Sequence, residues 1–154
     1  MARSVLGVIA GYVVMVLLVF ATFSGAYLLM GAEGAFRPDS YDVSGLWLLT
    51  SFVLAFLAAV AGGYVCAAVS RRDLAPLVLA VVVMAFGLIS AVQTLSARGE
   101  SPVRTGDVPN IAAAQQARMP PWVALLNPLV GAAGVLAGAR LRRAAPGSAA
   151  EAVA

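Results

Sequence analysis

Residues 45–95 read GLWLLTSFVLAFLAAVAGGYVCAAVSRRDLAPLVLAVVVMAFGLISAVQTL and decide the fold. Two apolar runs, 45–70 and 74–95, flank a charged turn, and neither run contains a charged side chain. A run of about 20 apolar residues is long enough to cross the hydrocarbon core of a bilayer as an α-helix. Because the turn between the runs is so short, the sequence predicts two antiparallel membrane-spanning helices here.

Two further apolar runs have the same character, 5–31 and 121–140. The first is much longer than the roughly 7 to 15 apolar residues of a signal-peptide core, so we expect it to remain as a span. Polar segments at 32–44 and 96–120 separate the runs and are expected on the outer side. The second polar segment is expected to carry a short helix at the membrane surface.

The composition also indicates a membrane protein. Hydrophobic residues make up 62% of the 154 residues and charged residues only 11%, whereas a soluble domain is about 45 to 50% apolar. We therefore predict an all-α, integral membrane four-helix bundle with antiparallel neighbours over residues 1–143. The small, biased segment 144–154 is predicted to be a disordered tail.

Orientation is predicted from the ten basic residues, all of which are arginines. Arginines that flank spans in short loops favour the cytoplasmic side, and acidic residues contribute little to this bias. The expected cytoplasmic anchors are Arg71, Arg72, Arg140, Arg142 and Arg143. Both termini are therefore predicted to be cytoplasmic. The basic residues form no stripe, so nucleic acid is not expected as a partner.

Most residue types that carry chemistry in membranes are missing. The chain has no His, no Lys and a single cysteine, Cys66, which excludes imidazole ligation, Schiff-base chemistry and an intramolecular disulfide. No Asp, Glu, Lys, Arg or His lies in the middle of a span, and such residues usually mark proton relays, ion pathways and catalysis. We expect no enzymatic activity, no cofactor and no metal.

Small residues recur at three- and four-residue spacing in every apolar run. Lipid provides no hydrophobic force between helices, so contact faces are built from small residues that let backbones approach. The predicted contact residues are Gly7, Gly11, Gly25, Ala55, Gly62, Gly63, Gly87, Gly131, Gly134 and Gly138. These residues predict packing within the bundle, an oligomer interface, or both.

Asn127 and Pro128 interrupt the last apolar run. A proline inside a helix removes one backbone hydrogen bond and favours a kink. One interpretation is a structural kink in which the Asn127 amide bonds a neighbouring group. The other is a ligand site, because interrupted helices line substrate paths in transporters.

These patterns predict a non-enzymatic multi-pass protein that acts by association, as an accessory subunit, scaffold or homo-oligomer. Its expected partners are the lipid bilayer and another membrane protein or a second copy. The lysine-free, arginine- and alanine-rich composition is typical of high-G+C bacteria, so the inner membrane is the expected location. The alternative is a transporter or channel for a small neutral or apolar solute, with an intramembrane enzyme as the third class.

Overall fold

The computed structural model describes residues 2–70, 74–96, 103–104 and 106–145. These residues form five helices, which are α1 (Ala2–Ala35), α2 (Gly45–Ser70), α3 (Leu74–Ser96), α4 (Asn110–Gln116) and α5 (Pro121–Ala144). Within the described stretches, extended pairing is limited to isolated bridges. The all-helical class predicted from the sequence is confirmed. The tail predicted at 144–154 lies outside the described residues from position 146 onward.

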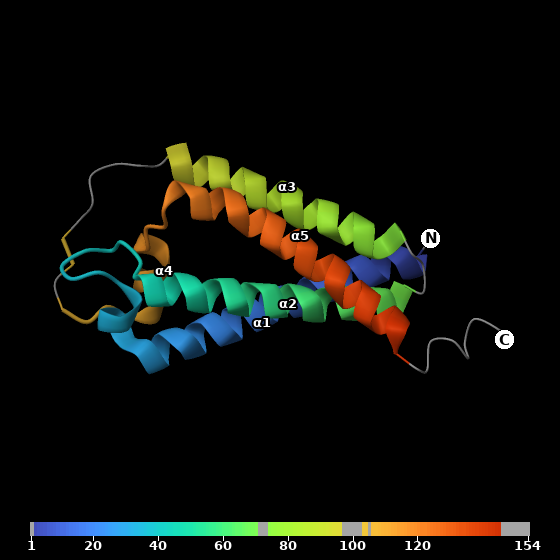
Figure 1. Cartoon of the computed structure of the whole chain (residues 1–154), viewed down its shortest axis with the longest axis horizontal. Coiled ribbons are helices and arrows are strands. Elements are labelled where there is room, and N and C mark those ends of the chain that lie inside the picture. The colour runs from blue at the N-terminus through green and yellow to red at the C-terminus, as the bar shows by residue number, and fades with distance from the viewer. Residues whose placement is uncertain (1, 71–73, 97–102, 105, 146–154) are drawn as a thin grey trace.

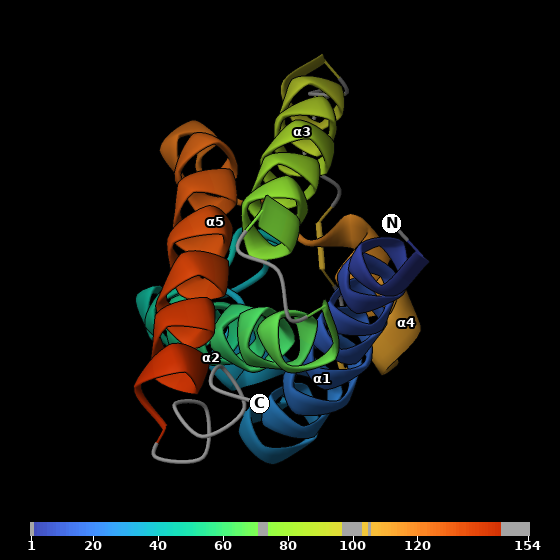
Figure 2. The ribbon, with the colours of Figure 1, turned by 90° about the vertical axis from the view of Figure 1, so that its right-hand side faces the viewer.

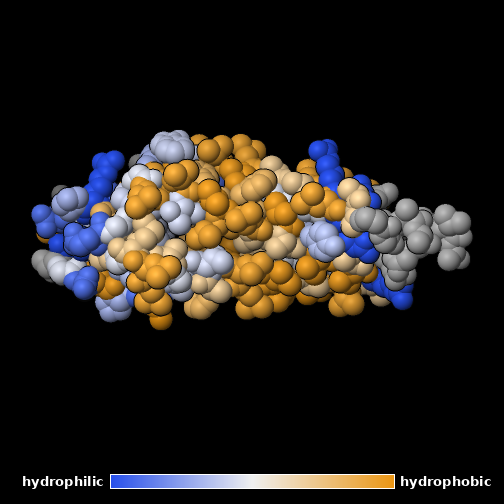
Figure 3. Space-filling model, turned by 60° about the horizontal axis from the view of Figure 1, so that its bottom comes forward, coloured by the Kyte–Doolittle hydropathy of each residue, from blue (hydrophilic) through white to orange (hydrophobic). Residues whose placement is uncertain are grey.

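Four of these helices, α1, α2, α3 and α5, are long and apolar enough to cross a membrane. Their exposed surface is also apolar, since Leu17, Phe20 and Leu29 of α1 expose 62%, 70% and 91% of their areas. On the face drawn in Figure 3, an apolar band separates hydrophilic residues at the two ends. Exposed apolar surface of this extent is typical of a multi-pass membrane protein.

The long helices alternate in direction along the chain (Figure 1). α1 begins and α5 ends at the same end of the bundle, which we call the terminal end. The segments that join α1 to α2 and α3 to α5 gather at the opposite end, which we call the cap end. The two hydrophilic ends of the molecule are therefore built from different parts of the chain.

Helix packing departs from the expected order of neighbours. α2 packs extensively against both α1 and α5, and α3 packs mainly against α5. α2 and α3 run in opposite directions as predicted but meet only sparsely, because α5 lies beside both of them (Figure 2). The hairpin predicted from the short turn is thus not the main helix contact. Instead, α2 has a parallel neighbour in α5.

The core between the long helices lies nearer the terminal end. Cys66, Leu79 and Val135 at its centre are completely inaccessible to solvent. The other buried members of this core are Ala59, Ala75, Ala80 and Ala132. Because most of these side chains are small, the helix backbones themselves lie close together here.

A second core lies at the cap end, beyond a break in α1. Gly31 interrupts α1 with φ 66° and ψ 178°, a backbone conformation that side-chain-bearing residues adopt only under strain. Ala32 and Ala35, which follow the break, are buried against the loop residues Phe36 and Val43. We refer to residues 32–44, 103–104 and 106–120 as the cap.

Candidate functional site

The contact between α2 and α5 brings two backbones together. A Cβ added to Gly63 would overlap the carbonyl oxygen of Val135, and a Cβ added to Gly138 would overlap that of Val60. A Cβ on Gly134 would lie 2.7 Å from the Cβ of Ala59. Helices approach this closely only where a residue has no side chain. Close backbone contact explains why α5, and not α3, is the second neighbour of α2.

The contact between α1 and α2 is reciprocal. A Cβ on Gly11 would lie 2.6 Å from the carbonyl oxygen of Gly62, and a Cβ on Gly62 would lie 2.7 Å from that of Gly11. One turn nearer the terminal end, a Cβ on Gly7 would lie 2.7 Å from the Cβ of Ser70. These three glycines therefore lie where the two backbones cross.

The contact between α3 and α5 is made by glycines against larger side chains. A Cβ on Gly87 would lie 2.6 Å from Cγ of Pro128, and a Cβ on Gly131 would lie 2.9 Å from Cγ1 of Val83. Pro128 is one of the largest fully buried residues among those that the structure describes. The proline ring thus fills the space that the missing side chain of Gly87 leaves.

One of the predicted contact residues lies elsewhere. A Cβ on Gly25 would meet nothing within 4 Å, so the predicted contact at Gly25 is not made. Ala55 of α2 is half-buried, and its predicted contact stays a prediction. The reason at Gly25 is that aromatic rings join α1 to α2 at this level. The ring of Trp47 lies 6.0 Å from that of Phe23 and 6.1 Å from that of Tyr27.

Asn127 and Pro128 are adjacent in sequence but lie in different surroundings. Pro128 is buried, whereas Asn127 is exposed. The Asn127 side chain makes no hydrogen bond to any part of the chain that the structure describes. The predicted amide bond to a neighbour is therefore not formed. Three hydroxyl side chains in the long helices do bond their own helix, namely Thr22, Ser51 and Thr94, with Thr22 donating to the carbonyl of Leu18 at 2.6 Å.

The predicted arginine anchors lie near the terminal end where they are described. Arg140 is exposed on α5, and Arg142 and Arg143 lie in the last turn of that helix. Arg71 and Arg72 lie outside the described residues. Among the residues that the structure describes, no group of three or more His, Cys, Asp or Glu side chains could hold a metal ion.

The cap is a folded unit whose short helix α4 is predicted from the sequence and confirmed, but whose contacts with the other loop are not predicted. Its two loops pair through the backbone, since the amide of Val43 donates to the carbonyl of Arg118 at 3.1 Å and the amide of Arg118 donates to the carbonyl of Tyr41 at 2.9 Å. The loop that follows α1 also closes on itself, with the amide of Ser44 bonding the carbonyl of Ala35 at 2.9 Å. The short helix α4 packs on this unit through the buried Ala113.

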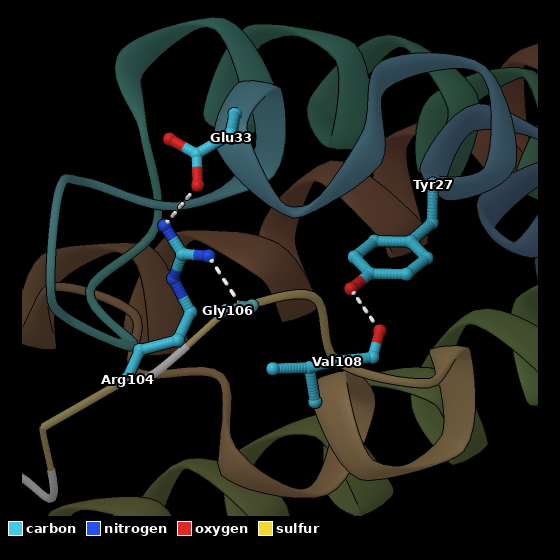
Figure 4. Close-up of polar contacts among 5 residues, drawn as sticks. All are labelled: Tyr27, Glu33, Arg104, Gly106 and Val108. Atoms are coloured by element: carbon cyan, nitrogen blue, oxygen red, sulfur yellow. Dashed lines mark hydrogen bonds and ion pairs between the residues drawn. The ribbon is translucent and has the colours of Figure 1, made fainter.

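Arg104 is the buried charge of the cap. Its Nη2 donates to Oε1 of Glu33 at 2.9 Å, and its Nη1 donates to the carbonyl of Gly106 at 3.0 Å (Figure 4). The Arg104 side chain is 3% exposed and that of Glu33 is 80% exposed. The Nε of Arg104 is buried with no partner among the described residues. A buried guanidinium depends on such partners, because an unpaired buried charge is costly.

Tyr27 of α1 bonds the part of the cap that lies between α3 and α4. Its hydroxyl donates to the carbonyl of Val108 at 2.6 Å (Figure 4). Its ring meets Phe36 edge-on with the centroids 6.3 Å apart, and Phe36 in turn meets Tyr41 at 5.7 Å. The connection between α3 and α5 is therefore fastened to α1, although α3 and α5 pack directly on each other.

Local sequence signals could not reveal these cap contacts. Glu33 and Arg104 are 71 positions apart, and Tyr27 and Val108 are 81 positions apart. The segment 103–120 has too few apolar residues to stand out as a folded unit. The local sequence signals of folding in this segment are limited to Asp107 and Pro109, which precede α4.

Comparison with known proteins does not assign the chain to a family. No protein-family model matches the sequence, and neither a curated protein nor a solved structure is significantly similar to it.

Proposed function

We propose that this chain is a non-enzymatic, multi-pass protein of the bacterial inner membrane that acts by association with itself or with another membrane protein. The observation that carries the proposal is the exposed amide of Asn127, which has no partner among the described residues. A polar amide in a membrane helix is stabilised when a neighbouring helix offers it a hydrogen bond. Because no described helix of this bundle bonds the Asn127 amide, the proposed partner for it is a helix of another chain.

The residues that fill the interior of the bundle support this proposal. The contact faces of α2 consist largely of glycine against backbone, as at Gly63 and Gly138, and the core at the terminal end consists mostly of alanines. The carboxylates in the described part of the chain, which are Glu33, Asp39, Asp42 and Asp107, all belong to the cap. Acid–base chemistry by these four carboxylates would therefore have to take place outside the apolar band.

We further propose that the terminal end faces the cytoplasm. Arg3, Arg140, Arg142 and Arg143 lie at this end, directly beside the apolar helices, where the positive-inside bias is strongest. At the cap end, Arg104 is instead part of a folded contact with Glu33. The cap then lies on the outer side of the membrane.

The alternative function is transport of a small neutral or apolar solute. In that case Asn127 and Pro128 would line the same solute path. Pro128 is buried against Gly87 while Asn127 is exposed, so this geometry favours association. A flux assay in liposomes separates the two functions. Association predicts no solute flux above that of protein-free vesicles, and flux that is lost in Asn127→Leu would favour transport.

Solubilisation at native abundance tests the proposed function. Membranes are extracted in a mild detergent, and the mass of the tagged chain is measured by size-exclusion chromatography with light scattering. We expect a complex heavier than one chain, whose composition is then determined by mass spectrometry. A chain that runs as a single copy in several mild detergents, and that forms no crosslinked product in native membranes, would rule the proposal out.

A further inference from the structure

We infer that α4 binds the phospholipid surface at the cap end of the membrane, with the side chain of Ile111 inserted among the lipids. In this arrangement Ile111 and Gln115 form the side of α4 that meets the lipid, and Ala113 lies on the side that meets the protein. The inference depends on the long helices crossing a bilayer, but it does not depend on the proposed association.

Tyr27 determines the depth at which α4 begins. It lies in the apolar run of α1, and the next two residues, Leu28 and Leu29, expose 75% and 91% of their areas. The Tyr27 hydroxyl donates to the carbonyl of Val108 at 2.6 Å, and Val108 precedes Asn110, the first residue of α4, by two positions. Along the bundle axis, α4 lies at the level where α2 begins (Figure 1). The start of α4 is therefore beside the apolar surface of α1 and not beyond the end of that helix.

α4 also lies at the side of the bundle. Figure 2 looks along the bundle and shows α4 at its periphery, next to α1. Ala113 of α4 is 2% exposed and belongs to the core of the cap, against which Trp47 also packs. Tryptophan is common at the boundary between hydrocarbon and water. This core, and α4 with it, therefore lies at the depth of a membrane interface.

Ile111 faces away from the core of the cap. Ile111 and Gln115 each lie two positions from Ala113, and two positions correspond to roughly 200° around an α-helix. Ile111 is 69% exposed, and Gln115 is exposed as well. Because Ala113 faces inward at the side of the bundle, Ile111 faces outward, in the direction of the lipid that surrounds α1.

The chemistry of this outward side fits a lipid surface. α4 contains no charged residue, so its contact with lipid removes no charge from water. Ile111 buries apolar area at the boundary of headgroups and acyl chains, and the Gln115 amide stays hydrogen-bonded to headgroups or water. α4 packs on α1, whose Leu28 and Leu29 are exposed at the same depth. The lipid that covers α1 therefore continues onto α4.

Fluorescence quenching tests the position of Ile111. With Cys66→Ala as background, Ile111→Cys, Phe20→Cys or Arg37→Cys carries a nitrobenzoxadiazole label in the full chain. The chain is reconstituted in liposomes of phosphatidylethanolamine and phosphatidylglycerol. Phe20, 70% exposed in the apolar band, is the lipid control. Arg37 is exposed in the loop between α1 and α2, which extends farther from the band than α4 (Figure 1), and is the water control.

A phospholipid with a nitroxide near the top of its acyl chain quenches from the lipid, and iodide on both sides of the membrane quenches from water. We expect the label at Ile111 to be quenched by the nitroxide as strongly as at Phe20 or more, and by iodide less than at Arg37. Quenching at Ile111 that matches Arg37, or protection from both quenchers, which would indicate a protein partner, would overturn the inference. If the label at Phe20 also escapes the nitroxide, the membrane-spanning account fails with it.

Substitution of Ile111 tests the contact without a label. The amide of Ala117 donates to the carbonyl of Ala113 at 2.9 Å, so its hydrogen exchange reports the opening of α4. In liposomes, Ile111→Gln should exchange roughly 3- to 10-fold faster there than Ile111→Leu, because it loses apolar area buried in lipid. Leucine and glutamine have similar helix propensities, so the comparison isolates the lipid contact. Equal exchange in the two variants would overturn the inference and leave the proposed association standing.

Discussion

The Nη2 of Arg104 lies 2.9 Å from Oε1 of Glu33, although the two residues are 71 positions apart. This ion pair joins the connection between α3 and α5 to the end of α1. It links the last two long helices to the first two at the cap end, where α2 and α5 diverge. The cap therefore holds together the part of the bundle that the glycine contacts do not reach.

Substitutions at Glu33 and at Arg104 are expected to lower the stability of the cap by different amounts. Glu33→Gln should cost at most about 1 kcal/mol of cap stability, because the carboxylate is 80% exposed and screened by solvent. Arg104→Ala should cost more, about 1 to 3 kcal/mol, because the Arg104 side chain is only 3% exposed and its removal breaks the hydrogen bonds to both Glu33 and the carbonyl of Gly106. Hydrogen exchange at the backbone amide of Arg118 measures both effects. Equal costs for the two variants would contradict the described burial.

Tyr27→Phe removes one hydrogen bond and retains the ring contacts. We expect a loss of about 1 kcal/mol in the local stability of the segment around Val108, measured as faster hydrogen exchange there. Tyr12→Phe is the matched control, because the Tyr12 ring meets Phe86 at 6.1 Å but its hydroxyl makes no hydrogen bond in the described chain. The same response in both variants would argue against the bond to Val108.

Gly31→Ala should strain the break in α1. The backbone at Gly31, with φ 66° and ψ 178°, lies in a region that costs a residue with a side chain about 1 to 3 kcal/mol. We expect faster proteolysis of the cap and unchanged packing between α2 and α5. Gly45→Ala is the control, since Gly45 is also surrounded by open space but has no positive φ. If Gly31→Ala behaves like this control, the break is not a fixed feature of the fold.

Gly63→Ala and Gly138→Ala should disrupt the contact between α2 and α5. In each case the new Cβ would overlap a backbone carbonyl, which no side-chain rotation can relieve, and we expect a loss of about 1 to 3 kcal/mol. Thermal unfolding in mild detergent measures the loss. Gly25→Ala, where the new Cβ meets nothing within 4 Å, should leave the midpoint within error of wild type. A larger effect at Gly25 than at Gly63 would contradict the described packing.

Labelling with a membrane-impermeant maleimide tests the sidedness. With Cys66→Ala as background, a cysteine at the exposed cap residue Arg37 should react in intact spheroplasts. A cysteine at Ala144, the exposed last residue of α5, should react only after permeabilisation. The reverse pattern would place the cap in the cytoplasm.

The helices could be predicted from the sequence because hydropathy is a local property. α2 occupies the predicted run 45–70, and α5 begins at the predicted Pro121. The order of neighbours could not be predicted in this way, because small-residue stripes occur on every long helix and do not specify which pairs meet. The close contact of Gly63 with Val135 became apparent only in three dimensions.

The candidate sites were less predictable than the helices. Asn127 shares a helix side with Gly134, but its exposure depends on where α2 leaves α5, which residue spacing does not encode. The cap depends on pairs such as Tyr27 with Val108, 81 positions apart. Charge and aromatic residues in the polar segments were visible in the sequence, but their partners were not.

If α1, α2, α3 and α5 cross a lipid bilayer, alkaline carbonate extraction of isolated membranes should not release the chain. We expect the chain to stay in the membrane pellet after the carbonate wash and to enter solution only with detergent. Recovery of the chain in the carbonate supernatant, or in the soluble fraction before the wash, would contradict it.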